Sequence, residues 1–413
     1  MMKERLMLTL AIAAVCCAPP EGYDVQKVNH RPDNGSQAII EDPGGGTQLP
    51  DSLAASLSDT VIYVSAVKFP SGYDWRRDSS ATDQGAKVVL YRNFSEILSL
   101  ECSEKEFVSS DADMHHILDG DLYTEYSTVT QTIVGKNGKE VLRFDGREYL
   151  EGLLERPEGT YTLSAQRNSD TLLLRRSGEV VLKVNGRAAL GWSSRSSGGT
   201  GALYEDGAEV CFCYISSKGG AYAVRNGKEA SVALPTRCRN VRDVSVLDGK
   251  TYVVADNGNI TSFKGNGFQS KLSERVWSEA QLFGMPGGMC VAGSFKDESD
   301  SLCSGVWWGR DSLEVTGPGD CLVYPSEEGS VGLKHSTKGE VELFRREEKI
   351  PSPEGCHYLF SRRCACVCGK RIYVLLTPVQ EGAGCALWMD GNRVEMNLNG
   401  FLTGLEVDVS PPS

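Results

Sequence analysis

The chain has 413 residues, of which 40% are hydrophobic and 24% charged, a balance too apolar for a wholly disordered protein. Its formal net charge is −12, which disfavours a general nucleic-acid binder, because such proteins present a basic surface to phosphate groups. Its 45 glycines against 16 prolines, with Asn-Gly and Asp-Gly pairs throughout, predict many tight turns. We therefore expect a folded, turn-rich protein with no nucleic-acid partner.

The first 17 residues are typical of an export signal. Lys3 and Arg5 precede an apolar run over residues 6–15 that is too short to span a bilayer. No later segment holds a continuous apolar run of membrane-spanning length. Residues 1–17 are therefore predicted to direct export.

Two cysteines end this signal and are candidates for a lipid anchor. Small residues leading into Cys16 and Cys17 resemble the lipobox of bacterial lipoproteins, a family in which the cysteine carries the lipid. The alternative is a plain secretory signal cut near Ala18, which the following Pro19 disfavours. We expect an exported protein, periplasmic or on the cell surface, attached to the outer membrane only through this lipid. Residues 18–51, rich in Pro, Gly, Asn, Gln and Asp, are predicted to be a flexible tether.

Short apolar runs separated by turn residues fill residues 52–413 and predict one domain of β-hairpins. Asn, Asp and Gly tolerate the positive φ that type I′ turns require. Eight strand–turn–strand units have turns near residues 92, 145, 185, 226, 266, 309, 346 and 390. A second hairpin precedes most of them, in segments 116–126, 164–174, 202–212, 245–254 and 323–333.

Each repeat of roughly 40–50 residues offers four short strands and no helical periodicity. This pattern predicts an all-β fold, an eight-bladed β-propeller with four-stranded antiparallel blades. Segment 403–410 resembles a first strand without partners, and segment 59–67 a second strand without its first. We expect the C-terminal strand to pair with the N-terminal blade and close the ring, leaving no open edge. Seven blades is the alternative, if a weak unit such as 341–352 is a loop.

One unit carries a family resemblance. Residues 248–267, DGKTYVVADNGNITSFKGNG, are similar to PQQ-type propeller repeats and to NHL repeats, whose V-A-D-x-x-N core matches Val254 to Asn259. With the lipid-anchor signal, the chain resembles envelope propeller lipoproteins of Bacteroidota and the outer-membrane assembly scaffold lipoproteins built from PQQ-type repeats. The resemblance implies a scaffold fold; it does not imply bound PQQ, because the vicinal cysteines of quinoprotein dehydrogenases are missing from the mature chain.

The cysteines favour packing over chemistry. Three interpretations stay open: small side chains that fill the gaps between blades, some disulfides in an exported protein, or a metal site at Cys364, Cys366 and Cys368. The alternating sets, which place each set on one face of a strand, are Cys211 and Cys213, and Cys364, Cys366 and Cys368.

The histidines and carboxylates show no catalytic or metal motif. His115 and His116 are adjacent, so on a strand they project to opposite faces and do not easily serve one metal. We find no P-loop, G-x-S-x-G or H-E-x-x-H pattern. No cofactor and no metal are therefore expected.

The predicted loops between blades are rich in arginine and aromatic residues, which are enriched at the energetic centres of interfaces. The alternative is that acidic neighbours neutralise these arginines. The predicted ligand-binding face comprises Tyr73, Trp75, Arg76, Arg77, Arg156, Trp192, Arg195, Arg237, Arg239, Arg242, Arg275 and Trp277.

Together these features predict a monomeric, non-enzymatic binding or scaffold module of the cell envelope. Its arginine and aromatic face would contact an envelope protein or a glycan. The competing class is a carbohydrate-active hydrolase or lyase on a propeller scaffold. That class needs acid and base groups converging in the central funnel.

Overall fold

The computed structural model describes residues 60–75, 85–101, 115–127, 130–167, 169–189, 199–272, 276–285, 288–309, 312–326, 328–359, 362–380 and 383–409. These residues form 34 β-strands in seven antiparallel sheets, with one 3-10 helix, η4 (Arg362–Cys364), and no α-helix. Over these ranges, no helix has the length and apolarity needed to cross a membrane. The predicted all-β class is confirmed.

Five of the sheets have four strands, and four of these five are continuous in sequence. The first contains β4 (His115–Leu118), β5 (Asp121–Ser127), β6 (Gln131–Lys136) and β7 (Lys139–Asp145). The second contains β17 (Asn240–Leu247), β18 (Lys250–Asp256), β19 (Thr261–Gly265) and β20 (Phe268–Lys271). The third contains β21 (Trp277–Met285), β22 (Gly288–Lys296), β23 (Leu302–Trp307) and β24 (Leu313–Pro318). The fourth contains β25 (Leu322–Tyr324), β26 (Val331–His335), β27 (Val341–Arg345) and β28 (Glu348–Ile350).

The fifth four-stranded sheet joins the two ends of the described chain. Its order is β3-β2-β1-β34, so the last strand lies beside the first. The register runs from Thr60 opposite Val409 to Lys68 opposite Gly400. The predicted closure of the ring by the C-terminal strand is therefore confirmed. The strands are β1 (Thr60–Lys68), β2 (Lys87–Arg92), β3 (Ser95–Glu101) and β34 (Gly400–Val409).

The sheet next to this closure has an interrupted inner edge. Both β29 (His357–Tyr358) and β30 (Ala365–Cys368) pair with β31 (Arg371–Pro378), and η4 lies between them in the chain. The sheet continues outward through β32 (Cys385–Met389) and β33 (Asn392–Met396).

The remaining sheet has nine strands because two four-stranded meanders are joined. The end of β11 pairs with the end of β14, and β12 adds to the free edge of β8. Gly186 permits the join, since a Cβ there would lie 2.3 Å from the carbonyl oxygen of Ile215. The strands are β8 (Glu148–Arg156), β9 (Gly159–Gln166), β10 (Thr171–Arg176), β11 (Glu179–Ala188), β12 (Gly199–Gly201), β13 (Tyr204–Asp206), β14 (Glu209–Ser216), β15 (Ala221–Arg225) and β16 (Lys228–Val232).

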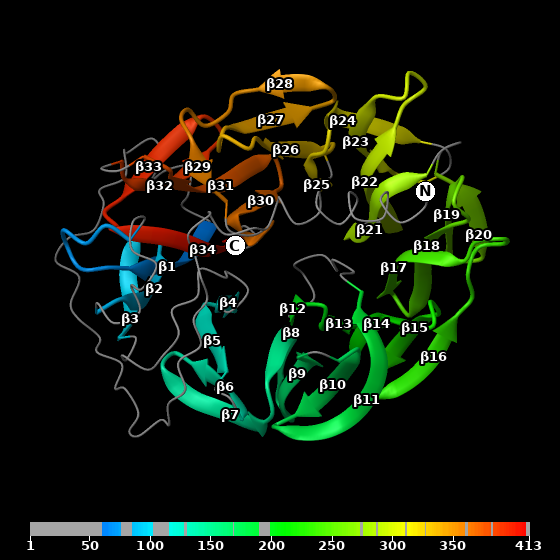
Figure 1. Ribbon diagram of the computed structural model, residues 1–413, viewed down its shortest axis with the longest axis horizontal. Coiled ribbons are helices and arrows are strands. Elements are labelled where there is room, and N and C mark those ends of the chain that lie inside the picture. The colour runs from blue at the N-terminus through cyan, green and yellow to red at the C-terminus, as the bar shows by residue number, and fades with distance from the viewer. Residues whose placement is uncertain are drawn as a thin grey trace, which may run out of the picture.

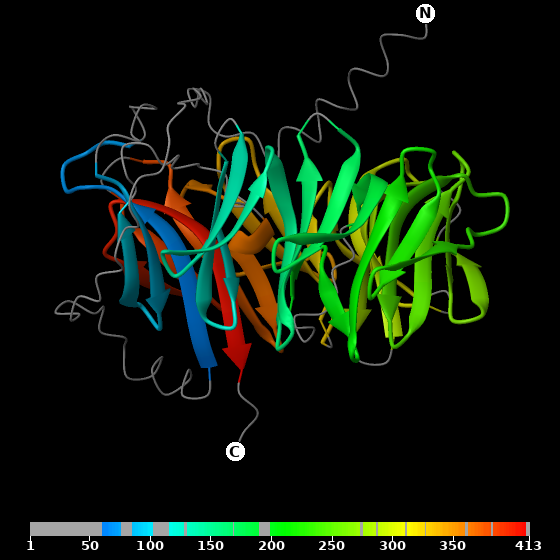
Figure 2. The ribbon, with the colours of Figure 1, turned by 90° about the horizontal axis from the view of Figure 1, so that it is seen from below.

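The sheets stand around a common axis like the blades of a fan (Figure 1). Seen from the side, their strands run between two faces of a thick disc (Figure 2). Stacking twisted sheets face to face in a ring buries both faces of each sheet, which a lone sheet cannot do. The fold is a β-propeller.

Antiparallel pairing gives the disc two different faces. Successive connections alternate between the two ends of the strands, so links between sheets share one end with the connections between second and third strands. We call this the link face; examples are residues 233–239 and 257–260. The opposite end carries the other two hairpin turns of each sheet, such as residues 157–158 and 177–178, and we call it the turn face.

Many of the recurrent Asn-Gly and Asp-Gly pairs, such as Asn226-Gly227, form hairpins on the turn face. Asn226 has a φ of 46°, and its side-chain oxygen accepts the backbone N–H of Val210 at 2.9 Å. The backbone N–H of Asn226 in turn donates to the carbonyl oxygen of Val210 at 2.8 Å. Each such turn therefore fixes the start of the second strand of its own sheet. The same side-chain bond joins Asn93 to Ile62, Asn137 to Leu122, and Asp390 to Ile372.

Six of the eight predicted unit turns, near residues 92, 226, 266, 309, 346 and 390, connect the third and fourth strands of a sheet, and the five second hairpins are also present. The turn predicted near 145 is wrong, because Gly146 begins the link from β7 to β8. The turn predicted near 185 is also wrong, because Asn185 lies inside β11. The hairpins of those two repeats turn at residues 137–138 and 177–178 instead.

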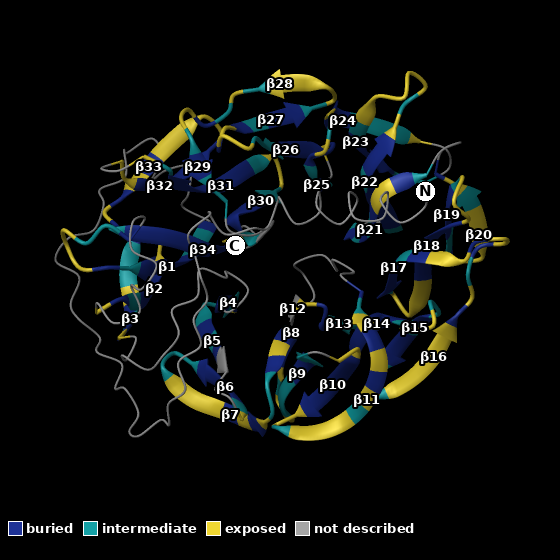
Figure 3. Cartoon of the chain, in the orientation of Figure 1, coloured by how far each residue is buried: buried dark blue, intermediate teal, exposed yellow. Residues whose placement is uncertain are grey.

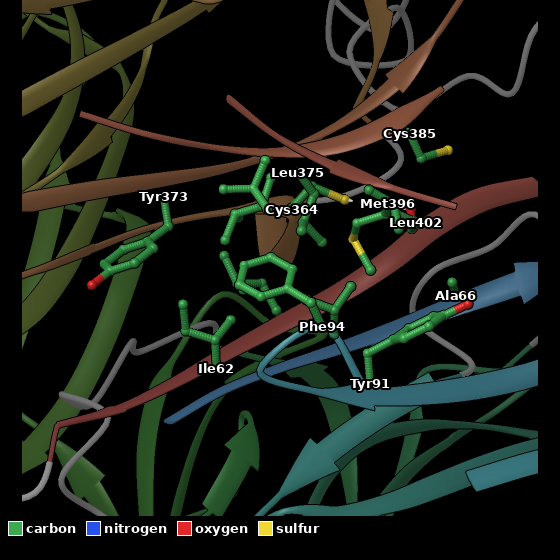
Figure 4. Close-up of a cluster of buried hydrophobic side chains, with 14 of the residues drawn as sticks. Ile62, Ala66, Tyr91, Phe94, Cys364, Tyr373, Leu375, Cys385, Met396 and Leu402 are labelled. Atoms are coloured by element: carbon green, nitrogen blue, oxygen red, sulfur yellow. Dashed lines mark hydrogen bonds between the residues drawn. The ribbon is translucent and has the colours of Figure 1, made fainter. Parts of the chain in front are cut away.

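The core lies in the gaps between neighbouring sheets, whereas the outermost strands are largely exposed (Figure 3). One gap cluster joins the closing sheet to the β29–β33 sheet, with Ile62 and Leu402 facing Leu375 (Figure 4). Cys364 and Cys385 belong to this cluster. Eight of the eleven described cysteines are buried, which agrees with cysteine as a small core side chain.

Candidate binding face

The link between β16 and β17 presents two of the predicted arginines on the link face. Arg237 and Arg239 are exposed, and neither has an ion-pair partner among the residues that the structure describes. Thr236 donates its backbone N–H to the side chain of Gln269 at 2.9 Å, which holds this link against β20. Arg237 has a φ of 66°, a conformation that costs an ordinary residue roughly 1 kcal/mol and persists only where neighbours impose it.

Arg242 lies at the start of β17, near this link, but it is neutralised. Its Nε donates to Oδ2 of Asp256 at 2.5 Å. Burial acts to raise the pKa of Asp256, but hydrogen bonds from Asn240, the Gly258 N–H and Arg242 outweigh it and hold that pKa below its usual range. Asp256 is therefore an anion at neutral pH, and Arg242 offers a ligand less charge than Arg237 does.

The two described tryptophans of the predicted face lie in the core instead. Trp75 is 1% exposed and packs on Phe69 and Phe401; Trp277 is fully buried and stacks on Phe295 at 4.8 Å between ring centroids. Large rings fill the widening gaps between sheets, so neither offers its surface to a ligand. These two predicted site residues are corrected accordingly.

Tyr73 is half-buried beside the same rings, with its centroid 5.4 Å from that of Phe69. It lies in the β1–β2 connection, on the link face. The backbone oxygen of Tyr73 accepts the side chain of Asn399 at 2.9 Å. The side chain of Tyr73 is therefore only partly available to a ligand on the link face.

Arg156 lies on the opposite face from Arg237. It ends β8 at the β8–β9 hairpin, which is a turn within one sheet and not a link between sheets as predicted. Its guanidinium pairs with Glu205 at 2.7 Å and with Glu158 at 3.4 Å. Arg156 is therefore removed from the predicted face, and the alternative of neutralised arginines holds for it. The remaining predicted residues lie outside the described residues: Arg76, Arg77, Trp192, Arg195, Arg275 and the anchor candidates Cys16 and Cys17.

Sequence reasoning missed two arginines on the link face of the β8–β11 sheet. Arg147 precedes β8 and Arg167 follows β9, and the Arg167 N–H donates to the carbonyl oxygen of Arg147 at 3.0 Å. The guanidinium of Arg167 lies over the ring of Tyr149, 4.3 Å from its centroid. The register of the β8–β9 hairpin brings residues 147 and 167 together. The sequence could have indicated this pair, but the turn wrongly predicted near residue 145 placed Arg147 inside a different hairpin.

Buried carboxylates on the inner strands join neighbouring sheets. Asp243 of β17 is 2% exposed, and its Oδ2 accepts the backbone N–H of Leu282 in β21 at 2.8 Å. Burial raises the pKa of Asp243 to about 7. Glu125 of β5 accepts the N–H of Leu150 in β8 at 2.9 Å. Both carboxylates are engaged with backbone of the next sheet.

A buried ion pair joins three strands of the β8–β11 sheet and contacts the sheet before it. Arg175 donates to both oxygens of Glu148, at 2.6 and 2.8 Å, and to Ser164 at 2.9 Å. The guanidinium also lies 4.4 Å from the ring centroid of Phe144 in β7. Because both charges are satisfied inside the protein, this pair is structural.

The adjacent histidines of β4 are also buried. Arg363 donates to Nδ1 of His116 at 2.8 Å and to the carbonyl oxygen of His115 at 3.3 Å. Burial, and secondarily Arg363, lowers the pKa of His115 to about 4, so it is neutral at pH 7. Among the described residues no group of three His, Cys, Asp or Glu side chains is arranged to hold a metal.

No family model and no curated protein matches the chain. Solved structures resemble it at 11% sequence identity. A eukaryotic initiation factor has a TM-score of 0.42 over 86% of this chain and 100% of its own. The β-propeller domain of the trilobed protease from Pyrococcus furiosus has a TM-score of 0.39, and the match covers 76% of this chain and 97% of that domain. A structure from a study of two prolyl endopeptidases has a TM-score of 0.41, and the match covers 72% of this chain. The chain spans half of that protein's length. Likeness at this level indicates nothing about activity.

Proposed function

We propose that this protein is a non-enzymatic binding or scaffold module of the cell envelope, held there by a lipid on Cys16 or Cys17. In this proposal the nine-stranded sheet counts as two blades, so the propeller has eight. The link face contacts an envelope protein or a glycan. The resemblance of residues 248–267 to PQQ-type and NHL repeats fits such a scaffold.

The observation that carries the proposal is the constrained link of residues 233–239. It holds Arg237 and Arg239 exposed and, over the described ranges, without ion-pair partners, in a chain whose net charge is −12. Arginine forks suit carboxylate and phosphate groups and are enriched where interfaces gain most of their energy. A backbone strained at Arg237 is a further reason to assign this link a role in binding.

The use of the buried acids supports a binding module over the competing enzyme class. A general acid or base must reach a substrate proton, and therefore needs a free oxygen or nitrogen at a cavity. Asp243, Glu125 and Glu148 instead bond to backbone or to arginine inside the protein. His115 is buried and neutral.

The test is capture of a partner from native membranes. Wild-type protein and the Arg237→Glu/Arg239→Glu variant are used as bait, with Lys139→Glu/Lys228→Glu as the matched control, because both lysines are exposed on the turn face. We expect one defined partner to be lost with the arginine variant and retained with the control. Equal recovery with all three baits rules out this face.

The same preparation tests the anchor. The Cys16→Ser/Cys17→Ser variant is expected in the soluble fraction, whereas wild-type protein needs detergent. A double variant that still needs detergent contradicts lipid attachment at these cysteines.

A further inference from the structure

Arg147 and Arg167 lie opposite each other at the open end of the β8–β9 hairpin. The register pairs Glu148 with Gln166, so the next pair outward is Arg147 with Arg167. Residues opposite each other in an antiparallel pair project to the same side of the sheet, with Cβ atoms about 5 Å apart. Tyr149, two residues along β8 from Arg147, projects to that side as well.

This side of the sheet faces the β13–β16 strands. Ala165, which is paired with Tyr149, packs on the cluster that contains Phe212 of β14. Glu148 projects to the other side, where it meets Arg175 above Phe144 of the preceding sheet. The two arginines and Tyr149 therefore lie at the link-face mouth of the gap between the two meanders.

Neither guanidinium is neutralised by a carboxylate of the described residues. Within the described part of the chain, Arg147 and Arg167 have no ion pair and no side-chain hydrogen bond, and the Nε atom of each is buried without an acceptor. Of the carboxylates close to them in sequence, Glu148 is paired with Arg175, and Asp145 and Asp170 form no ion pair with either arginine. Like charges directly opposite each other destabilise a sheet. Two other arginines of this sheet, Arg156 and Arg175, each have a carboxylate partner, in contrast to Arg147 and Arg167.

We infer that Arg147 and Arg167 form a binding site for an oxyanion, the carboxylate or phosphate group of a ligand that docks on the link face. Two guanidinium forks can share one oxyanion through charge-assisted hydrogen bonds, and the anion removes the repulsion between them. Tyr149 is a positioning residue, because its ring holds the guanidinium of Arg167 by a cation–π contact. This inference deepens the proposed binding function by naming a chemical group and a second position on the same face.

The test measures the urea midpoint of the purified full-length chain against added sodium phosphate, with ionic strength held constant by sodium chloride. A ligand that binds only the folded state raises the folded-to-unfolded ratio about 11-fold at ten times its dissociation constant. We expect a saturable rise for wild type and for Arg176→Gln, an exposed arginine on the turn face of the same sheet. Arg147→Gln and Arg167→Gln should lose that rise.

Two further comparisons exclude a merely structural role. Without phosphate, Arg147→Gln and Arg167→Gln should be at least as stable as wild type, because each removes a repulsion. Tyr149→Leu should reduce the rise in urea midpoint that phosphate causes. Tyr149→Phe keeps the aromatic ring and should retain that rise. A parallel titration with acetate distinguishes a carboxylate site from a phosphate site.

An identical response of all variants to phosphate and to acetate, or no response of wild type to either, overturns the inference. This test needs no partner protein. A failed membrane capture with Arg237→Glu/Arg239→Glu therefore leaves the oxyanion site standing, and the loss of the phosphate response leaves the Arg237 link untouched.

Discussion

Asp243 shows how one buried side chain joins two sheets of the ring. Its two oxygens accept the backbone N–H groups of Val244 and Leu282 at 2.9 and 2.8 Å. Removing these acceptors would leave two buried donors unsatisfied, which costs more than the bonds contribute. The arrangement buries a carboxyl group away from solvent. The stability of the protein therefore depends on pH.

The direction of that dependence follows from the pKa of Asp243, which burial raises from 3.8 to about 7. Between these values the folded state binds the proton and the unfolded state does not, so stability falls as the pH rises through this window and is level above it. We expect Asp243 to lower the free energy of unfolding by on the order of 3 kcal/mol between pH 5 and pH 8. Urea denaturation at both pH values measures this change.

The comparison needs the Asp243→Asn variant, because His115 acts in the opposite direction. Burial and Arg363 lower the pKa of His115 to about 4, so its contribution rises with pH up to its unfolded value of 6.5. The asparagine side chain does not titrate in this range. The free energy of unfolding of the variant should therefore rise relative to that of wild type as the pH increases. A difference that is the same at both pH values would show that Asp243 does not titrate in this window.

At the residue scale, the sequence could predict the kinds of side chain on the link face but not which ones reach solvent. Trp75 and Trp277 stand in loop-like segments, yet both fill gaps between sheets, since rings far apart in sequence meet there. Whether an arginine is neutralised likewise depends on strands distant in the chain. Arg156 meets Glu205 across two meanders, and no local pattern encodes that contact.

At the scale of the hairpin, turn chemistry sets strand positions. Asn226 combines a positive φ with a side-chain bond to the buried strand residue Val210. The same combination at Asn93, Asn137 and Asp390 explains why short polar residues recur at these turns.

Replacing Asn226 with Ala should therefore cost roughly 2 kcal/mol, about half from the left-handed backbone and half from the lost acceptor. The control is Asn392→Ala, because Asn392 is exposed in β33 and has an ordinary strand backbone. The control should stay within about 0.5 kcal/mol of wild type. Urea denaturation measures both variants, and equal losses would argue against a role for the side-chain bond.

Hairpin turns were predictable where Asn-Gly or Asp-Gly stands between two short apolar runs, as at residues 226 and 390. The pair at residues 185–186 has the same letters but a different role, because Gly186 allows β11 to approach β14. A glycine needed for positive φ and one needed for close backbone approach look identical in sequence. The second kind depends on a neighbour some thirty residues away, which is why the joined nine-stranded sheet was not foreseen.

At the scale of the whole ring, stability depends on the place where the chain ends meet. The contact between β1 and β34 is supported by side chains from both strands and from the preceding sheet. Thr403 bonds to Ser65 at 2.9 Å, and the Leu402 N–H donates to Thr377 at 3.0 Å. Closure therefore couples three parts of the chain, and it was predictable because each end lacked the strands that the other supplies.

Gly400 is the point at which this closure is most sensitive. A Cβ at that position would lie 1.8 Å from the carbonyl oxygen of Val67, so Gly400→Ala must push β34 away from β1. We expect a loss of roughly 2–3 kcal/mol, as for other overpacked positions, and faster amide hydrogen exchange in both strands. The matched control is Gly384→Ala, whose Cβ has its one close contact, at 2.9 Å, with the flexible end of the Glu395 side chain. A similar small loss in both variants, with unchanged exchange in β1 and β34, would mean that the ring does not depend on this contact.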